Sequence, residues 1–186
     1  MDFMMGFILL MVFSPLLLII SLLLFITFQG NPFFIQERIG QNNVLFKLIK
    51  FKTYREMGRP DSIPLIGKIL RITSLDELPQ LINIIKGEMS FIGPRPLLPE
   101  YLPFYTKEEV SRHRVKPGLS GLSQLKIGNT SEWNKRLAYD VQYVNNQSIR
   151  LDCKILLQTL LLLFFLRRRN RQDVPIESFA DFAKRR

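Results

Sequence analysis

The sequence predicts an α+β fold that is mostly helical and attaches to a membrane through its N-terminal segment. An almost wholly apolar run without a charged residue covers Phe3 to Phe28. Two short β-like runs with a polar loop between them follow, which predicts a hairpin. Farther along, apolar residues recur at helical spacing in several segments up to residue 166. We therefore expect a membrane helix at residues 1–30, a main domain at 31–166 and a basic tail at 167–186.

The composition limits the chemistry that this chain can perform. It has 186 residues and a formal net charge of +10, which favours anionic partners such as phosphorylated small molecules or anionic membrane lipid. Its basic residues flank apolar stripes, so no nucleic acid is expected as a partner. Cys153 and His113 are the single cysteine and the single histidine. An intrachain disulfide, a cysteine or histidine zinc site and a Ser-His-Asp triad are therefore not expected, which leaves acid–base work to carboxylates, lysine or tyrosine.

The apolar N-terminal run is longer than the roughly 20 residues that a helix needs to cross a bilayer. It is too long for a signal peptide and lacks a basic start and a cleavage site. Ser14-Pro15 lies near its middle, where proline removes a backbone donor and the serine hydroxyl can serve the freed carbonyl. This break fits both a mild kink in a spanning helix and a sharp bend in a re-entrant one. Positive charges indicate that the following side is cytoplasmic: Arg38, Lys47, Lys50, Lys52, Arg55 and Arg59.

The hairpin is expected from β-like runs at Phe33–Ile35 and Val44–Phe51, joined by a loop at Gly40–Asn43. Lysines alternate with apolar residues in the second run. Such a strip suits a phosphate or lipid headgroup boundary, but protective lysines on an edge strand give the same pattern. A loop over Met57–Ile63 and a short amphipathic helix over Pro64–Ile72 are expected next.

An acid pair, Asp76-Glu77, lies at the centre of the chain and is expected to start a helix that ends at Gly87. Ser74 with Glu77 three residues later matches a capping box, and acids at a helix start are favourable without any catalytic role. The alternative is chemical. A magnesium ion needs only one or two carboxylates together with phosphate oxygens. An aspartate can then attack phosphorus, and arginine side chains suit the charge of a transferring phosphoryl group.

Two arginines flank the acid pair. Arg71 precedes it, and Arg95 follows between two prolines in a stiff, extended segment that can hold its side chain at a phosphate. An aromatic stripe over Pro96–Tyr105 fits either a membrane interface or a core helix.

The C-terminal half is expected to contain a basic loop, a turn and two helices. Their ranges are Arg112–Gly118, Gly118–Leu122, Ser131–Asn145 and Leu151–Leu166. The last run is too short to span a bilayer, so it is expected to pack on the domain or to lie in the interface. Arginines follow it at Arg167, Arg168, Arg169 and Arg171, which fits anionic lipid.

The motifs together resemble the bacterial sugar transferase family, the monotopic phosphoglycosyl transferases, from about Asp2 to Leu160. The resemblance is carried by Phe46-Lys47, Lys50-Phe51-Lys52-Thr53, Arg71 to Gln80, Lys86 to Pro96, Lys116 to Gly121 and Tyr139-Asp140-Val141. The chain differs where the family has a Gly-Arg-Asn motif, because Ile127-Gly128-Asn129 lacks the arginine. Walker, G-x-S-x-G, H-E-x-x-H and dinucleotide fingerprints are missing from the sequence.

The resemblance implies transfer of a sugar 1-phosphate from a UDP-sugar to undecaprenyl phosphate, with release of UMP and with Mg²⁺ as cofactor. It implies that Asp76 is the nucleophile of a covalent phospho-sugar intermediate and that Glu77 binds the metal with it. It places Arg71 and Arg95 at the phosphates. Other residues expected to bind substrate are Lys52, Arg112, His113 and Asp140.

The resemblance also implies that Ser14-Pro15 makes the N-terminal helix re-entrant. The protein would then be monotopic on the cytoplasmic face of a bacterial inner membrane, with interfacial amphipathic helices. The sequence leaves a homodimer open. The competing function is a membrane-bound adaptor without catalysis that binds anionic lipid through the basic and aromatic surfaces.

Overall fold

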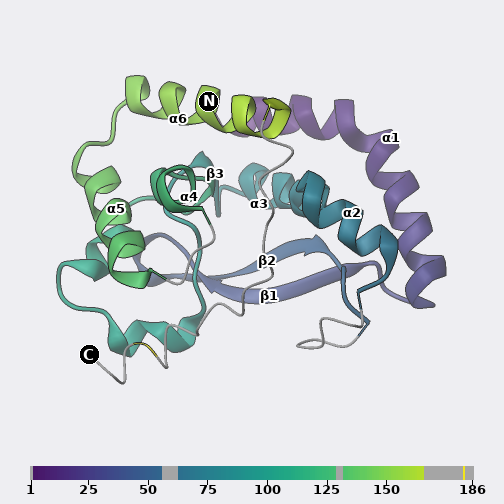
Figure 1. Cartoon of the computed structure of the whole chain (residues 1–186), viewed down its shortest axis with the longest axis horizontal. Coiled ribbons are helices and arrows are strands. Elements are labelled where there is room, and N and C mark those ends of the chain that lie inside the picture. Colours follow the sequence, from purple (N-terminus) through teal and green to yellow (C-terminus); the bar gives the residue numbers. More distant parts are fainter. Residues whose placement is uncertain (1, 56–62, 129–131, 166–181, 183–186) are drawn as a thin grey trace. The chain divides into compact units, whose positions relative to one another are not determined.

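The computed structural model describes residues 2–55, 63–128, 132–165 and 182. Its contacts form two compact units, one of residues 1–36 and 47–87 and the other of residues 37–46 and 88–186. The secondary structure is mostly helical with two small sheets, which confirms the α+β class (Figure 1). Nearly all of the loop expected at Met57–Ile63 and of the tail expected at 167–186 lies outside the described residues.

Helix α1 covers Asp2–Phe28 and belongs to the first unit. Among the described residues it is the one helix long and apolar enough to cross a membrane. Most of its large side chains face away from the protein: Phe3, Met4, Phe7, Ile8, Met11, Val12, Leu18, Ile19, Leu22, Leu23, Phe25 and Ile26. An apolar surface of this extent on a helix is typical of a membrane-associated protein.

The Ser14-Pro15 pair lies inside α1, and the helix changes direction near its middle (Figure 1). Proline has no N–H, so the carbonyl of Met11 loses the donor that residue 15 would supply. The hydroxyl of Ser14 donates a hydrogen bond to this carbonyl at 2.8 Å. This confirms the prediction that the Ser14 hydroxyl can replace the backbone donor that is missing at Pro15.

The hairpin consists of β1 (Phe33–Ile39) and β2 (Leu45–Phe51), which pair in one sheet and are joined by a 3-10 turn at Gln41–Asn43. The prediction of a hairpin is confirmed, although β1 is longer than expected. Along β2, Phe46 and Leu48 are buried, and Leu45 and Lys47 are exposed. This alternation is the period of a half-buried strand.

The core of the first unit contains side chains from α1, from β2 and from the helix that follows the hairpin. Buried Ile20 and Leu24 from α1 pack with Phe51 of β2 and Leu70 of α2, the helix over Leu65–Thr73. Around them lie Leu16, Leu17, Phe28, Phe33, Ile66 and Leu75. The second half of α1 is thus held by the hairpin and α2.

Helix α3 (Leu81–Ile85) is fixed to the same unit through Asn83, whose side chain is fully buried. The Asn83 amide donates to the carbonyl of Lys47 at 2.8 Å and accepts from the N–H of Ile49 at 3.1 Å. One side chain therefore satisfies a donor and an acceptor on β2. Gly87 has a φ of 77° and donates its N–H to the carbonyl of Ile84, which confirms that it ends this helix.

The second unit contains a parallel pair of short strands, β3 (Ser90–Ile92) and β4 (Gly118–Ser120). Ser90 pairs with Gly118, and Ile92 pairs with Ser120. The turn expected at Gly118–Leu122 is therefore wrong, because its first residues are extended and paired. A Cβ added at Gly118 would lie 2.1 Å from the backbone nitrogen of Gly93, so only glycine permits this close approach.

The described part of the second unit also contains the α-helices α4 (Leu122–Ile127), α5 (Trp133–Asn145) and α6 (Ile149–Phe165). The last two confirm the predicted helices within a few residues. Thr159 of α6 is hydrogen-bonded to Ser120 of β4, with 2.7 Å between the hydroxyl oxygens. Leu97 and Tyr101 pack against Trp133 and Leu137 of α5. The aromatic stripe at 96–105 thus places part of its side chains in the core, in a 3-10 helix over Pro99–Phe104.

Candidate functional site

The acid pair lies in a short 3-10 helix over Leu75–Gln80 in the first unit. Ser74 ends α2 in a left-handed conformation, with φ of 59° and ψ of 16°, and no side-chain capping hydrogen bond forms there. The predicted capping box is therefore wrong. A serine at an N-cap typically has an extended backbone. Ser74 is left-handed instead, and α2 therefore leads directly into the next helix. The backbone N–H of Glu77 donates to the Ser74 carbonyl instead, at 3.2 Å.

Without a side-chain cap at Ser74, the favourable position of both acids in the first turn of this helix remains as a structural explanation. Asp76 is only 9% exposed, although a carboxylate is costly to remove from water unless charges or hydrogen bonds compensate it. Glu77 is half-buried beside it. Among the residues that the structure describes, no group of three or more His, Cys, Asp or Glu could hold a metal ion. The acid pair fits Mg²⁺ only in the mode that completes its shell with water and phosphate oxygens.

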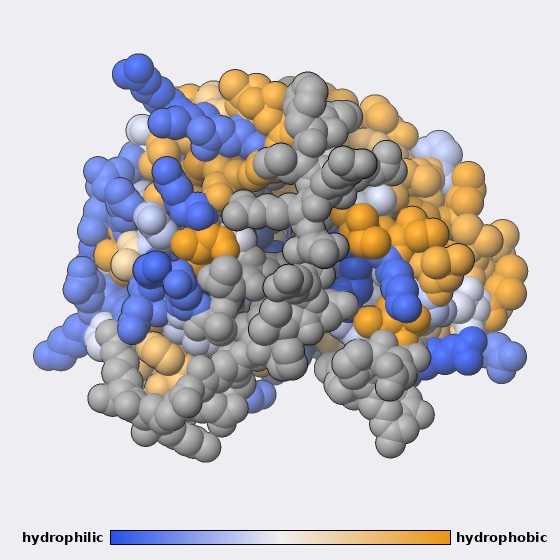
Figure 2. Space-filling view, viewed as in Figure 1, coloured by the Kyte–Doolittle hydropathy of each residue, from blue (hydrophilic) through white to orange (hydrophobic). Residues whose placement is uncertain are grey.

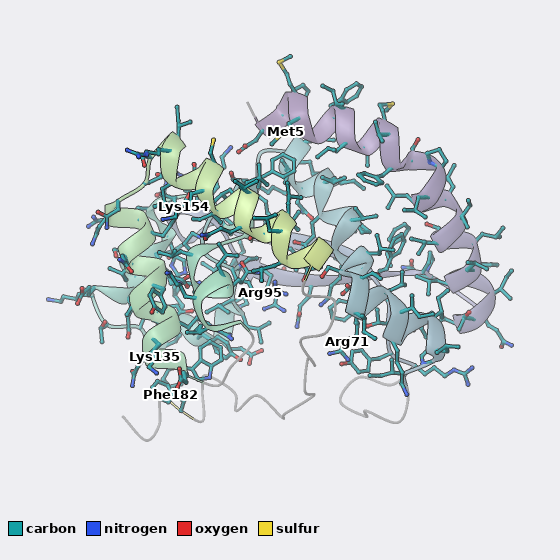
Figure 3. All side chains as sticks on the ribbon, turned by 45° about the horizontal axis from the view of Figure 1, so that its top comes forward. Met5, Arg71, Arg95, Lys135, Lys154 and Phe182 are labelled. Atoms are coloured by element: carbon teal, nitrogen blue, oxygen red, sulfur yellow. The ribbon has the colours of Figure 1, made fainter. Side chains whose placement is uncertain are left out.

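Arg71 lies in the last turn of α2, just before the acid pair (Figure 3). Its guanidinium carbon lies 4.9 Å from the ring centre of Tyr54, and Nη1 donates a hydrogen bond to the Tyr54 hydroxyl. Lys52 lies two positions before Tyr54 in the chain, and its Nζ is 5.2 Å from the ring centre of Phe28. Both predicted cationic residues of the first unit are thus placed against aromatic rings.

Arg95 belongs to the second unit, between Pro94 and Pro96. Its carbonyl accepts a hydrogen bond from Nη2 of Arg112 at 2.7 Å. Arg95, Arg112 and His113 lie close together, with Pro94, Pro96 and Pro117 around them. The stiff segment expected from the prolines is therefore held to the unit through the backbone of Arg95.

Arg112 and Asp140 form a buried ion pair in which each side chain is 1% exposed. Nη2 and Nε of Arg112 lie 2.7 and 3.1 Å from Oδ2 of Asp140, and the hydroxyl of Ser123 donates to Oδ1 at 2.7 Å. Burial alone would lower the pKa of Arg112, but Asp140 and then Tyr105 outweigh it and raise the pKa. The guanidinium therefore stays charged, and its contacts are with the protein.

His113 is buried in the 3-10 helix over Glu109–Arg114, so the basic loop expected at Arg112–Gly118 starts three residues later than predicted. Burial, and secondarily the charge of Arg112, lowers the pKa of His113 to about 3. The neutral ring must then donate from Nδ1 to Oδ1 of Asn43, which lies 2.7 Å away. Its Nε2 is left as the acceptor that faces Nη1 of Arg112 at 3.4 Å.

Two further arginines of the second unit were not predicted. Arg38 donates to the carbonyl of Pro96 at 3.4 Å, and burial with the charge of Arg95 lowers its pKa to about 10. Arg136 lies with its guanidinium carbon 4.7 Å from the ring centre of Trp133, and burial followed by Arg95 lowers its pKa as well. Arg95 thus repels both Arg38 and Arg136, and an anion beside Arg95 would relieve the repulsion. A single arginine within a strand or helix carries no sequence signal that would have marked it.

The predicted residues therefore fall into two sets. The first unit contains Ser14, Pro15, Lys52, Arg71, Asp76 and Glu77. The second unit contains Arg95, Arg112, His113 and Asp140. Within the second set, Arg112 contacts each of the other three.

Comparison with known proteins gives one matching family model, described as bacterial sugar transferase, over residues 1–166. The chain is 45% identical over 139 residues to the uncharacterized sugar transferase EpsL of Bacillus subtilis, covering 70% of this chain and 69% of that protein. It is 38% identical to the exopolysaccharide production protein ExoY of Rhizobium meliloti, covering 81% and 78%. It is 34% identical to the UDP-glucose:undecaprenyl-phosphate glucose-1-phosphate transferase of Klebsiella pneumoniae, covering 85% of this chain but 38% of that longer protein.

Proposed function

The chain belongs to the bacterial sugar transferase family, and on this premise we propose that it transfers a sugar 1-phosphate from a UDP-sugar to undecaprenyl phosphate. The observation that carries the proposal is the family match, which includes the acid pair and the flanking arginines. The name of the Klebsiella relative supports the substrate class. The product, a lipid-linked sugar diphosphate, would serve exopolysaccharide assembly, as the name of ExoY suggests for that relative.

The proposed reaction has two displacements. A carboxylate oxygen of Asp76 attacks the phosphorus that bears the sugar, and the bond from this phosphorus to UMP breaks. An oxygen of undecaprenyl phosphate then attacks the same phosphorus, and its bond to Asp76 breaks. The carboxylate is regenerated, and the two steps together release one UMP and one lipid-linked product.

Charge compensation is the main task proposed for the other residues of the predicted site. Glu77 and Asp76 would hold Mg²⁺, which neutralises the acid pair and phosphate oxygens when bound. Arg71, Lys52 and Arg95 are proposed to bind phosphate oxygens, and the unpredicted Arg38 and Arg136 add to the positive potential around Arg95. Arg112 contacts Asp140, His113 and the Arg95 carbonyl. This supports an indirect role in substrate binding, through the position of Arg95.

The membrane topology is part of the same proposal. We propose that α1 enters the bilayer, turns back at Ser14-Pro15 and returns to the cytoplasmic face. The change of direction in α1 supports re-entry over a straight spanning helix, whereas the exposed apolar side chains and the Ser14 hydrogen bond fit either topology. Apolar side chains of α6 are also exposed, at Ile149, Leu157, Leu160 and Leu161. Orange apolar surface is extensive in Figure 2, as an interfacial protein requires.

The test of the function is UMP release by the purified chain in detergent with undecaprenyl phosphate, Mg²⁺ and a panel of UDP-sugars. We expect release with at least one sugar, loss of release when Mg²⁺ is chelated, and a loss of at least about 1,000-fold in Asp76→Asn and Glu77→Gln. Glu132→Gln is the matched control, because this carboxylate is exposed and pairs with Lys135 across 3.0 Å. Full activity of Asp76→Asn would contradict the proposed nucleophile. Lipid binding without release for any sugar would favour the adaptor.

A further inference from the structure

Tyr54 lies beside Arg71 in the first unit and has no role in the reaction described so far. It follows β2, which ends at Phe51, and it is half-buried. Arg71 lies in the last turn of α2, farther along the chain. The two side chains meet because the strand end runs along the helix.

The approach of these two segments depends on Gly67, which lies one helical turn before Arg71 on α2. A Cβ added at Gly67 would lie 2.4 Å from the carbonyl oxygen of Thr53, so a side chain there would push the strand end away. The backbone at Thr53 is buried against the helix. Residues four apart on a helix share a face, so Tyr54 is brought alongside Arg71.

The contact between Tyr54 and Arg71 restrains the guanidinium in two ways. The ring lies under it, with 4.9 Å from the ring centre to the guanidinium carbon, and cations are attracted to the face of an aromatic ring. The phenol oxygen accepts a hydrogen bond from Nη1, which fixes the rotation of the planar group over the ring. A long arginine side chain otherwise loses considerable rotamer freedom when it binds a ligand.

We propose that Tyr54 is a positioning residue, which holds the Arg71 guanidinium in the orientation that binds phosphate oxygens of the nucleotide-sugar. The inference rests on the proposed function, in which Arg71 binds phosphate. Tyr54 does not touch substrate in this account. Its effect is exerted through Arg71, because a restrained guanidinium loses less freedom when the phosphate arrives.

A double-mutant cycle on UMP release separates positioning from a purely structural role. We expect Tyr54→Phe, which keeps the ring, to lower kcat/KM about threefold, and Tyr54→Leu to lower it about tenfold. We expect Arg71→Ala to lower it about 100-fold or more. In the Arg71→Ala background, Tyr54→Leu should have less than a twofold effect, because the residue that it positions is gone.

The matched control is Phe34→Leu, which removes an aromatic ring from under Lys50, 5.3 Å from its Nζ, and should leave kcat/KM within twofold. An equal loss from Tyr54→Leu with and without Arg71 would overturn the inference and leave the proposed function intact. Full activity of Tyr54→Leu would overturn it too. No UMP release by the unmodified chain with any donor would overturn both.

Discussion

At the scale of single residues, the buried charges of Arg112 and Asp140 in the second unit are compensated by each other and by hydrogen bonds. Arg112, Asp140 and Ser123 satisfy one another, and Arg112 also reaches the backbone of Arg95. The sequence predicted Arg112, His113 and Asp140 as substrate-binding residues, and this stays a prediction. The sequence could not predict that Arg112 and Asp140 contact each other, because they lie on separate helices and only the fold brings them together.

Breaking the Arg112–Asp140 pair should destabilise the protein. Asp140→Asn leaves a buried guanidinium without its counter-charge, which typically costs about 3–5 kcal/mol. We expect a large drop in the thermal unfolding midpoint in detergent. Lys135→Gln is the control, since it breaks the exposed pair with Glu132 and should change stability by no more than about 1 kcal/mol. An equal drop in both variants would contradict the burial of the first pair.

The lowered pKa of His113 makes stability depend on pH. The unfolded chain binds a proton near the ordinary pKa of 6.5, whereas the folded chain does so only near 3. Stability from the neutral ring is therefore complete above pH 6.5 and is lost as the pH falls from 6.5 toward 3. We expect roughly 2 kcal/mol or more of this loss to disappear in His113→Gln. Identical pH profiles of thermal unfolding for the two proteins would contradict this.

At the scale of elements, helical spacing and turn residues predicted α2, α5, α6 and the hairpin. Strands β3 and β4 were missed, because each has three residues and neither shows an alternating pattern of its own. The capping box at Ser74 was predicted and is wrong, since a serine that ends one helix in a left-handed turn has the same local sequence as one that caps the next helix. Local patterns therefore identified long elements and failed where two elements meet.

The break in α1 gives a prediction about topology. Pro15→Ala restores the N–H for the Met11 carbonyl, so the helix should straighten and part of the population should span the membrane. A cysteine introduced at Phe3 in a Cys153→Ser background reports this, because Cys153 is exposed and would otherwise react. We expect no labelling by an impermeant reagent outside the cell with Pro15, and labelling with Pro15→Ala. External labelling with Pro15 present would contradict re-entry.

At the scale of the whole molecule, membership of the family, the buried Asp76 and the clustered arginines are consistent with transfer of a charged phosphate group at a membrane. The acid pair was predicted from the sequence as nucleophile and metal ligand, and this stays a prediction, since acids in the first turn of a helix are also favourable by themselves. Arg38, Arg136 and Tyr54 could not be predicted, because the neighbour that suggests a role for each of them is remote in the chain.

The most direct test of the central claim is single-turnover labelling with a UDP-sugar in the absence of undecaprenyl phosphate. One UMP should be released per protein, and the intact protein should gain the mass of a sugar phosphate. Peptide mapping should place this group on Asp76, and addition of undecaprenyl phosphate should remove it. Asp76→Asn should neither release UMP nor gain mass. Transfer to the lipid by a protein that never carries the group, or a labelled Asp76→Asn protein, would contradict the account.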